Sequence, residues 1–473
     1  MLKAKIIGTP KTTLKLFLIL LITHCSLLIT NCFAQIITWE RTYGHTDPYY
    51  EYANSIIQTP DEGYLVAGYD VSYQKALVIR LNKYGDTLWY KAQPYGAPCI
   101  NIMSTYDGSY IAFMATNYLI KFDINGNIIW YGGPYNSDAL MVGIVQLNDS
   151  GFIMWGAKFF GNIVKPHIIR INSNGYFLWE RTYTNFYDAI FTGMCNQPAN
   201  ELVFAGGYGD SSVSSRLFIM KTDLTGNQIF FYGYDTLFWH YPIFIHKTLS
   251  NNFVIGGTNF LVNINQSGEI NWYKRYLNYL NYEYLSLTNT NDGGFAITGW
   301  FDSVGSSYER LFILKTDSSG NEQWRRIKST NDHYKGKSIK QTSDSGFVIA
   351  GYKNNDVYVL KTDSEGFNLI GITPISNIIP ITSKLYQNFP NPFNPITKIK
   401  FDIAFVKNHS VNLNVKLTIF NILGQEIEVL INERLSEGSY EIDFNADNLP
   451  SGIYFYKLET EDYMQSKKMI VLK

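Results

Sequence analysis

The 473-residue sequence is poor in charge and in cysteine. Only 17% of its residues are charged, and 39 basic side chains stand against 40 acidic ones. A chain without a basic excess does not attract nucleic acid electrostatically, so we expect no nucleic-acid partner. Of its four cysteines, Cys99 and Cys195 lie far apart in the sequence, and we interpret them as two buried thiols rather than a disulfide.

The usual signatures of catalytic and metal sites are also missing. The sequence has no HExxH motif, no nucleophile elbow and no glycine-rich phosphate-binding loop. His240 and His246 are six residues apart, which is too loose a spacing to argue for a metal site. We therefore expect no metal and no cofactor, and we favour a non-catalytic protein. Carboxylates assembled from distant repeats are the alternative, because no short motif would reveal them.

One long apolar stretch lies at the N-terminus. Residues 16–29 are mostly apolar, four lysines precede them, and the small residue Ala34 follows. This order predicts a signal peptide spanning residues 1–34, with cleavage after Ala34. The stretch is short for a membrane-spanning helix, which needs about 20 residues, so a non-cleaved anchor is the alternative. Cleavage would take the net charge from −1 to −5 by removing four lysines, and no later segment is long and apolar enough to span a membrane.

Aromatic residues are abundant. They make up 16% of the chain, with 36 Tyr and 30 Phe. Together with the many Asn and Gly residues, this surplus is typical of strands and tight turns rather than of helices. The composition therefore predicts an all-β fold.

A motif repeats seven times in the middle of the chain. In each copy an Asp or Asn precedes a glycine by three residues, and a large apolar residue follows the glycine by four. The Asp or Asn side chain can bond the backbone two residues on, and glycine accepts a positive φ, so each copy predicts a hairpin turn. Successive glycines are 41 to 52 residues apart, and the pairs are Gly85/Trp89, Gly126/Trp130, Gly175/Trp179, Gly226/Phe230, Gly268/Trp272, Gly320/Trp324 and Gly366/Ile370.

A second hairpin signal precedes the motif in each unit, as in Asp61-Glu62-Gly63, although repeats 4 and 5 lack its aspartate. Each unit therefore predicts four short antiparallel strands in about 40–50 residues, the size of a propeller blade. We predict that residues 35–372 form a seven-bladed β-propeller. Residues 36–43 resemble a fourth strand with no blade before it, and they share Trp-Glu-Arg-Thr-Tyr with residues 179–183. We expect them to pair into the seventh blade and to hide two sheet edges.

Two residue types recur around the motif. The repeated tryptophans are expected to pack between neighbouring blades, because a buried ring contributes a large apolar area; they are Trp39, Trp89, Trp130, Trp179, Trp272 and Trp324. Five residues before the turn glycine, six units carry a cation and one carries Asn263. These cations either pair with turn aspartates or form a ring of positive charge; they are Arg80, Lys121, Arg170, Lys221, Lys315 and Lys361.

The loops between blades are rich in aromatic residues. Aromatic platforms flanked by Asn and Asp suit sugar rings or extended peptides, although tyrosines can also simply pack such loops down. We interpret the propeller as a non-catalytic module that binds glycan or protein. The alternatives are a carbohydrate-active hydrolase or lyase with carboxylates near the axis, and a structural surface-layer component. The candidate ligand-binding residues are Tyr49, Tyr135, Tyr187, Trp239 and Tyr282.

The composition changes after the repeats. Residues 373–384 are rich in Pro, Ile, Ser and Thr without periodicity, which predicts a linker. Residues 385–473 alternate apolar and polar residues in short runs separated by turn signals near Gly424, Gly438 and Gly452. This pattern predicts a small immunoglobulin-like antiparallel β-sandwich of about seven strands.

Four motifs in this last segment resemble the type A C-terminal sorting domain of the type IX (Por) secretion system of Bacteroidetes. The resemblance implies export through the periplasm to the outer-membrane surface or the medium, with the type IX secretion machinery as a partner. It implies nothing about the activity of the exported cargo. The motif residues that carry it are Asn391, Pro392, Phe393, Asn394, Pro395, Gly424, Gln425, Glu426, Ser451, Gly452 and Lys468.

Overall fold

The computed structural model consists of two compact units, one formed by residues 37–370 and the other containing residues 371–473. The predicted signal peptide lies outside the described part of the chain. The described residues are 37–44, 50–93, 97–196, 201–210, 213–238, 242–257, 260–276, 281–302, 308–328, 332–367, 372–376, 380–404, 413–435, 438–446 and 449–473.

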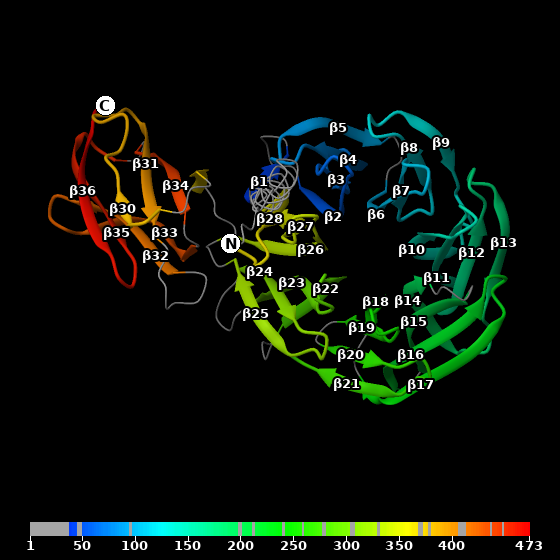
Figure 1. The fold of residues 1–473 in the computed structure, drawn as a ribbon. Coiled ribbons are helices and arrows are strands. Elements are labelled where there is room, and N and C mark those ends of the chain that lie inside the picture. Colours follow the sequence, from blue (N-terminus) through cyan, green and yellow to red (C-terminus); the bar gives the residue numbers. More distant parts are fainter. Residues whose placement is uncertain are drawn as a thin grey trace, which may run out of the picture. The chain divides into compact units, whose positions relative to one another are not determined.

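The first unit holds seven four-stranded antiparallel sheets arranged around a common centre (Figure 1). In six of these sheets the strands are neighbours in the order of the sequence, with the first strand innermost and the fourth outermost. In the seventh sheet the outermost strand is β1 (Trp39–Tyr43). This arrangement confirms the predicted seven-bladed β-propeller.

The blades have the following strands. Blade 1 contains β2 (Glu51–Gln58), β3 (Tyr64–Asp70), β4 (Lys75–Leu81) and β5 (Thr87–Gln93), and blade 2 contains β6 (Cys99–Ser104), β7 (Tyr110–Met114), β8 (Leu119–Phe122) and β9 (Ile128–Gly132). Blade 3 contains β10 (Ala139–Gln146), β11 (Phe152–Phe160), β12 (Ile163–Ile171) and β13 (Phe177–Thr182), and blade 4 contains β14 (Asp188–Asn196), β15 (Glu201–Asp210), β16 (Val213–Asp223) and β17 (Gln228–Phe238). Blade 5 contains β18 (Pro242–Lys247), β19 (Phe253–Gly257), β20 (Leu261–Ile264) and β21 (Ile270–Lys274), and blade 6 contains β22 (Asn281–Asn289), β23 (Phe295–Asp302), β24 (Glu309–Thr316) and β25 (Glu322–Ile327). Blade 7 contains β26 (Tyr334–Gln341), β27 (Phe347–Lys353), β28 (Asp356–Thr362) and β1 (Trp39–Tyr43).

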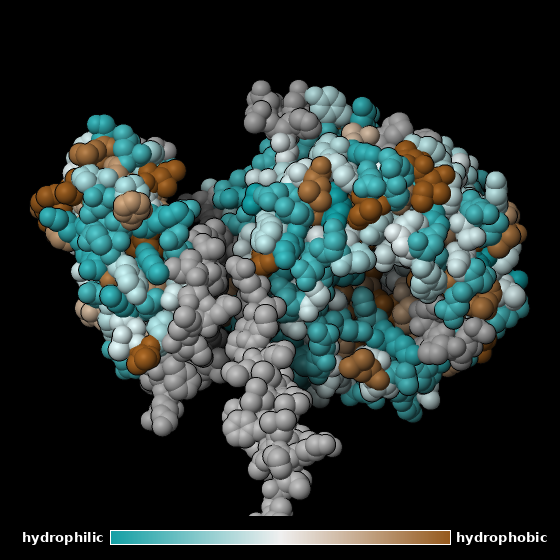
Figure 2. Space-filling model, turned by 45° about the horizontal axis from the view of Figure 1, so that its top comes forward, coloured by the Kyte–Doolittle hydropathy of each residue, from teal (hydrophilic) through white to brown (hydrophobic). Residues whose placement is uncertain are grey.

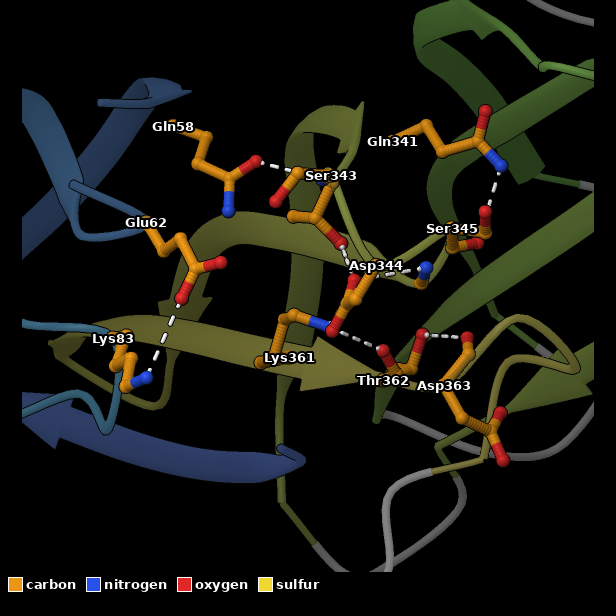
Figure 3. Close-up of polar contacts among 12 residues, drawn as sticks. Gln58, Glu62, Lys83, Gln341, Ser343, Asp344, Ser345, Lys361, Thr362 and Asp363 are labelled. Carbon is orange, nitrogen blue, oxygen red and sulfur yellow. Dashed lines mark hydrogen bonds and ion pairs between the residues drawn. The ribbon is translucent and has the colours of Figure 1, made fainter. Parts of the chain in front are cut away.

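The N-terminal strand closes the ring. β1 pairs antiparallel with β28 along its whole length, so it is the outermost strand of blade 7. Blade 7 is also bonded to blade 1, because the backbone N–H of Ser343 donates to the Gln58 side chain at 2.8 Å (Figure 3). Nearby, the N–H of Ile56 donates to the Ser338 hydroxyl at 3.3 Å. This is the closure that the sequence pattern predicts, and it gives β1 and β28 hydrogen-bonded partners.

The hairpins between the third and fourth strands follow the predicted turn chemistry. The Asn82 side-chain carbonyl accepts hydrogen bonds of 2.9 Å from the N–H groups of Tyr84 and Asp86, and Gly85 adopts a φ of +81°. The same pair of bonds recurs in the other six units, where the acceptors are Asp123, Asn172, Asp223, Asn265, Asp317 and Asp363.

The turn glycines also set the contact between blades. The Trp39 ring of blade 7 lies against Gly85 of blade 1, where an added methyl group would come within 2.8 Å of the ring. The Trp39 indole N–H donates to the carbonyl of Lys83 in the same turn at 2.9 Å. Such a tryptophan lies between two blades, at a position where the neighbouring blade has no side chain. Trp89 is the exception, because the Lys91 side chain and not the Trp89 ring lies against Gly126. The same ring-on-glycine packing joins Trp130 to Gly175, Trp179 to Gly226, Trp272 to Gly320 and Trp324 to Gly366.

The repeated cations pair inside their own blades. Arg80 is only 2% exposed, and its guanidinium lies 2.6 Å from the Asp61 carboxylate in the strand 1–2 turn. Lys361 is equally buried and pairs with Asp344 at 2.8 Å (Figure 3). The same pairing joins Lys121 to Asp107, Arg170 to Asp149 and Lys315 to Asp292.

In the two blades without the turn aspartate, the cation either bonds another residue or is absent. In blade 4, Lys221 instead donates to the backbone and side-chain oxygens of Gln266 in blade 5, at 3.1 and 2.9 Å. In blade 5 the cation is replaced by Asn263, which accepts a hydrogen bond from Asn271 at 2.7 Å. The cations therefore pair with turn aspartates where the aspartates exist, so they do not form a free ring of charge.

Every innermost strand has a β-bulge at the same place. In each of the seven, the pairing with the second strand skips one residue. A bulge leaves that residue out of the ladder and shifts the alternation of side chains beyond it. The seven skipped residues are Asn54, Ile100, Val142, Thr192, Ile243, Leu285 and Lys337.

The second unit is a small sandwich of two four-stranded antiparallel sheets. Its buried residues come from alternating strand positions, as in Val415, Leu417 and Ile419. The first sheet has the order β29 (Ile372–Ser376), β34 (Gly438–Asn445), β31 (Ile396–Ile403) and β30 (Lys384–Leu385). The second has the order β33 (Glu426–Leu435), β32 (Leu413–Asn421), β35 (Gly452–Glu459) and β36 (Met464–Val471).

The predicted linker at residues 373–384 needs correction. Its start belongs to β29, which pairs with β34, and its end enters β30, so the sandwich has eight strands rather than about seven. Pro374 suggested a break in structure, but β29 lies at the edge of its sheet, where a missing N–H costs no ladder bond. The β-branched residues Ile372, Thr373 and Ile375 favour a strand there.

The face of the molecule shown in Figure 2 is mainly hydrophilic, with its hydrophobic side chains in small separate groups. No helix among the described residues is long and apolar enough to cross a membrane. Cys99 and Cys195 are free thiols, and burial raises the pKa of each to about 12. Both thiols are therefore protonated at neutral pH.

The ring-on-glycine contact can be tested with a matched pair of alanines. Gly85 and Gly108 both have a positive φ, but a methyl group on Gly108 would meet no atom within 4 Å. Gly108→Ala should therefore lower the free energy of unfolding by about 1–2 kcal/mol, the cost of the left-handed backbone alone. Gly85→Ala should lower it by roughly 1–3 kcal/mol more, because the Trp39 ring must move. Chemical denaturation measures both losses, and equal losses would contradict the packing role of Trp39.

The turn aspartates predict acid sensitivity. Burial alone would raise the pKa of Asp61 and Asp149, but their hydrogen bonds and the paired arginine outweigh it and hold each pKa below its ordinary value. An unfolded aspartate titrates near pH 3.9, so this stabilisation is complete above about pH 4 and is lost as the pH falls through the lower folded values.

We therefore expect the melting temperature to fall steeply below about pH 4. Asp61→Asn should weaken that dependence while lowering stability at pH 7, because Arg80 stays buried without its carboxylate. Thermal unfolding between pH 7 and 2 measures both effects. A variant as acid-sensitive as the natural protein would contradict this account.

Candidate functional site

The five candidate ligand-binding residues do not come together in one described site. Tyr49 and Trp239 lie outside the described residues, and the side chain of Tyr282 does too, although its backbone is part of β22. Tyr187 lies in the loop between blades 3 and 4, is 57% exposed, and has the Lys165 ammonium 5.9 Å from its ring centroid. Only this residue of the five presents a described ring to solvent.

Tyr135 lies in an interface between blades. It is 7% exposed, and its hydroxyl donates to the carbonyl of the turn glycine Gly175 in the next blade at 2.5 Å. This placement leaves no face of the ring for a ligand, so we leave Tyr135 out of the site proposed below. Four other tyrosines make the same bond, each four residues after the position of the repeated aromatic: Tyr43 to Gly85, Tyr183 to Gly226, Tyr234 to Gly268 and Tyr276 to Gly320.

A different group of aromatic and charged residues does gather in one place. It lies where the innermost strands of blades 6, 7 and 1 begin and their second strands end. This is the face that carries the strand 2–3 loops and the aromatic-rich loops between blades, where we expect a ligand to bind. We call it the 6–7–1 cluster, and it comprises Glu283, Trp300, Glu309, Lys335, Lys337, Tyr352, Tyr50 and Tyr52.

The inner part of the cluster is held by ion pairs and hydrogen bonds. The Lys335 ammonium lies 2.5 Å from the Glu309 carboxylate and 3.8 Å from the centroid of the Trp300 ring. The Tyr352 hydroxyl donates to Glu309 at 2.6 Å, and the Trp300 indole N–H donates to Glu283 at 3.1 Å. These contacts fix the orientation of both aromatic rings and engage both carboxylates.

The outer part of the cluster is a pair of tyrosines beside a lysine. Tyr50 is 36% exposed, and its ring centroid lies 5.7 Å from that of Tyr52 and 5.9 Å from that of Tyr352. The Lys337 ammonium lies 5.0 Å from the centroid of the Tyr52 ring, which is a cation–π distance. Desolvation raises the pKa of both tyrosines and lowers the pKa of Lys337, which Lys335 lowers further.

Sequence reasoning found part of this cluster. Of the three tyrosines at positions 49, 50 and 52, Tyr49 is a candidate predicted from the sequence, and Tyr50 and Tyr52 are not. Trp300 and Tyr352 were missed, although each directly follows the glycine that ends the apolar run of the second strand, as Tyr69 does in blade 1. Aligning the units by that glycine would have indicated an aromatic group shared by blades 1, 6 and 7.

A separate cleft of about 470 Å³ lies between blades 6 and 7 on the opposite face, at the hairpin turns. Its polar groups are already bonded to one another. Lys315 donates to Asp292 at 2.7 Å and to Gln323 at 2.8 Å, and the Gln341 side chain accepts from the N–H of Asn291 at 2.8 Å. We interpret this cleft as part of the contact between the two blades.

The sorting-motif residues of the second unit meet around the C-terminal strand. The Asn391 side-chain carbonyl accepts from the N–H of Ile470 at 2.9 Å. Phe393 is 2% exposed, and its N–H donates to the carbonyl of Ile470 at 3.0 Å. The Ser451 hydroxyl accepts from the N–H of Lys473 at 2.8 Å. Motifs that are about 80 residues apart in the sequence thus fix the last residues of the chain.

The second motif, which contains Gly424, forms a hairpin turn. Gly424 has a φ of +76°, and the Asn421 side chain accepts from the N–H groups of Leu423 and Gln425 at 2.9 and 3.0 Å. The turn joins β32 to β33, and the side chains at its tip, Ile422 and Leu423, are 68% and 79% exposed. It repeats the turn chemistry of the propeller hairpins in a different domain.

The propeller unit is similar in fold to known structures. A streptogramin B lyase structure aligns with a TM-score of 0.50 and 14% sequence identity, over 70% of this chain and 99% of that one. The structure of YCF48 bound to D1 peptide aligns with a TM-score of 0.45 and 10% identity, over 69% of this chain and 96% of that one. No curated protein sequence matches the chain. At these identities the likeness concerns the fold alone.

The second unit also matches a family in sequence. The family described as "Secretion system C-terminal sorting domain" matches residues 387–472, which include all four motifs. Residues 387–472 are therefore a Por-type secretion C-terminal sorting domain, by which the type IX secretion machinery exports this propeller protein to the cell surface or beyond.

Proposed function

We propose that the propeller is a non-catalytic carbohydrate-binding module that works outside the cell, and that its ligand contacts the 6–7–1 cluster. The observation that carries the proposal is the pair of tyrosines, Tyr50 and Tyr52, held beside Lys337 on the face with the strand 2–3 loops. Aromatic rings stack on the apolar faces of sugars, and ammonium and amide groups can bond sugar hydroxyls.

The carboxylates of the cluster support binding over catalysis. A glycosidase needs two carboxyl groups free to act on either side of the scissile bond. Here Glu309 is engaged by Lys335 and Tyr352, and Glu283 accepts the indole N–H of Trp300. Both acids therefore orient the aromatic rings, which is what a binding surface requires.

Export supports the same reading. The sorting domain takes the propeller to the cell surface or the medium, where polysaccharides of the cell and its surroundings are accessible. The contacts with Glu309, Glu283 and Lys337 hold the aromatic side chains in place without a ligand. Such preorganisation lowers the entropy cost of binding.

We expect the full chain to bind a polysaccharide on a glycan array, and Tyr50→Ala and Tyr52→Ala each to weaken that binding by roughly 3- to 10-fold. This corresponds to the loss of one aromatic contact. Tyr106→Ala is the control, because Tyr106 is 65% exposed but lies in a strand 1–2 turn on the opposite face. Isothermal titration with the best ligand from the array measures the three affinities.

A panel of hydrolase and lyase substrates tested on the same sample separates the alternatives. Turnover of any polymer would overturn the non-catalytic assignment. Equal losses in all three variants would contradict the chosen site. No binding and no turnover would favour a structural role at the surface.

A further inference from the structure

We propose that the ligand is an anionic polysaccharide, whose uronate or sulfate groups contact Lys337 and Lys340 on the innermost strand of blade 7. This inference rests on the proposed carbohydrate-binding function and names the class of carbohydrate. It is carried by the distribution of charge on the innermost strands, by the missing partners of two lysines, and by a comparison of the seven blades position by position.

Positive charge on the innermost strands is concentrated on one of them. β26 carries Lys335, Lys337 and Lys340. Among the other six innermost strands only β18 has basic residues, His246 and Lys247, while Glu51, Asp188 and Glu283 are acidic. The propeller therefore has a basic stripe along one side of its centre, on blade 7.

Two of the three lysines have no ionic partner among the described residues. Lys335 is paired with Glu309, as described above. Lys337 contacts the ring of Tyr52, and neither Lys337 nor Lys340 lies within ion-pair distance of a described carboxylate. Both are partly buried. Glu283 opposes the lowering of the Lys337 pKa but forms no ion pair with it. A cation that is partly withdrawn from water without a directly paired counter-charge gains when an anion binds beside it.

The fold does not require a lysine at either position. Lys337 is the bulged residue of its strand, and the corresponding bulged residues of the other blades are all uncharged: Asn54, Ile100, Val142, Thr192, Ile243 and Leu285. Lys340 is opposite Val348, and the corresponding residues of the other blades are Ile57, Met103, Val145, Cys195, His246 and Thr288.

The bulge also brings the two lysines to one side of the strand. Residues three apart on a regular strand point to opposite faces, but the bulge restores them to the same face. Blade 3 shows this directly, because the equivalent residues Val142 and Val145 pack against the same hydrophobic cluster. The contact of Lys337 with Tyr52 indicates that this side faces blade 1.

The spacing favours a polymer over a single small anion. A strand rises about 3.3 Å per residue, so the two lysines lie roughly 10 Å apart along β26. One carboxylate or sulfate group cannot reach both, whereas a chain with repeated acidic sugars can. Tyr50 and Tyr52 at the open end of the same stripe provide the rings for stacking. A ligand that carries both acidic groups and apolar sugar faces would contact the two lysines and the two tyrosines together.

The test compares acidic and neutral polymers on the full chain. The probes are polygalacturonate, dextran sulfate, uncharged dextran and poly-glutamate, and the readout is the dissociation constant at 50 and 300 mM salt. We expect tight binding of one or both acidic polysaccharides. The binding should weaken at 300 mM salt, because salt screens the attraction between the lysines and the acidic groups of the polymer. Lys337→Gln and Lys340→Gln should each weaken it about 10-fold, the effect of losing one charge-assisted contact.

Matched variants keep the result interpretable. Lys75→Gln removes the same charge from an exposed lysine at a strand 2–3 loop of the same face, and it should leave the affinity within about 2-fold. Lys337→Arg should retain binding. Melting temperatures of all variants report whether they fold, and the uncharged residues at the equivalent positions indicate that glutamine is accepted there.

Equal binding of acidic and neutral polysaccharides, unchanged in both glutamine variants, would overturn this inference and leave the proposed carbohydrate-binding function standing. Binding of poly-glutamate in preference to every polysaccharide would overturn it in favour of an acidic protein ligand. A chain that binds no polysaccharide on the array or here would lose the proposed function and this inference together.

Discussion

The contact between a tryptophan ring and the turn glycine of the next blade is the interaction on which the propeller depends. A single four-stranded sheet cannot bury both of its faces, so each blade is stable only against its neighbours. Because Trp39 comes from the N-terminal strand and lies on Gly85, the contact continues across the junction of the chain ends. The tyrosine hydroxyls that bond the same glycines add a directional hydrogen bond to a contact that is otherwise dispersive.

A buried cation paired with a turn aspartate is the second recurring contact, and it lies inside five of the seven blades. A buried Arg or Lys is costly without a carboxylate, and the chain follows this rule unit by unit. The three acid–lysine pairs and two acid–arginine pairs occur where the aspartate exists, whereas blade 5 replaces the cation by Asn263 and blade 4 turns Lys221 toward Gln266. The correlation within one sequence shows that the two residues act as a unit.

Much of the fold was predictable because short local residue patterns specify its turns. An Asp or Asn three residues before a glycine specifies a hairpin regardless of its surroundings, and seven such turns at regular spacing specify seven blades. Tyr135 was misjudged because a loop tyrosine looks the same in sequence whether its hydroxyl meets solvent or the carbonyl of Gly175. The 6–7–1 cluster was only partly foreseen, since Tyr352 of blade 7 becomes a neighbour of Tyr50 only through the closure of the ring. β29 was missed because Pro374 is tolerated at an edge that only the assembled sheet defines.

Repetition gives this protein an internal reference for separating structure from function. A residue type found in most blades, such as the Trp, the turn glycine or the buried cation, serves the ring, because every blade needs it. A residue type found once, at a position that other blades fill with uncharged side chains, is not needed by the ring. By this criterion Lys337 and Lys340 of β26 stand apart from the framework, on the side where blade 7 meets blade 1. That junction is also where the N-terminal strand closes the propeller, because β1 pairs with β28 of blade 7 along its whole length.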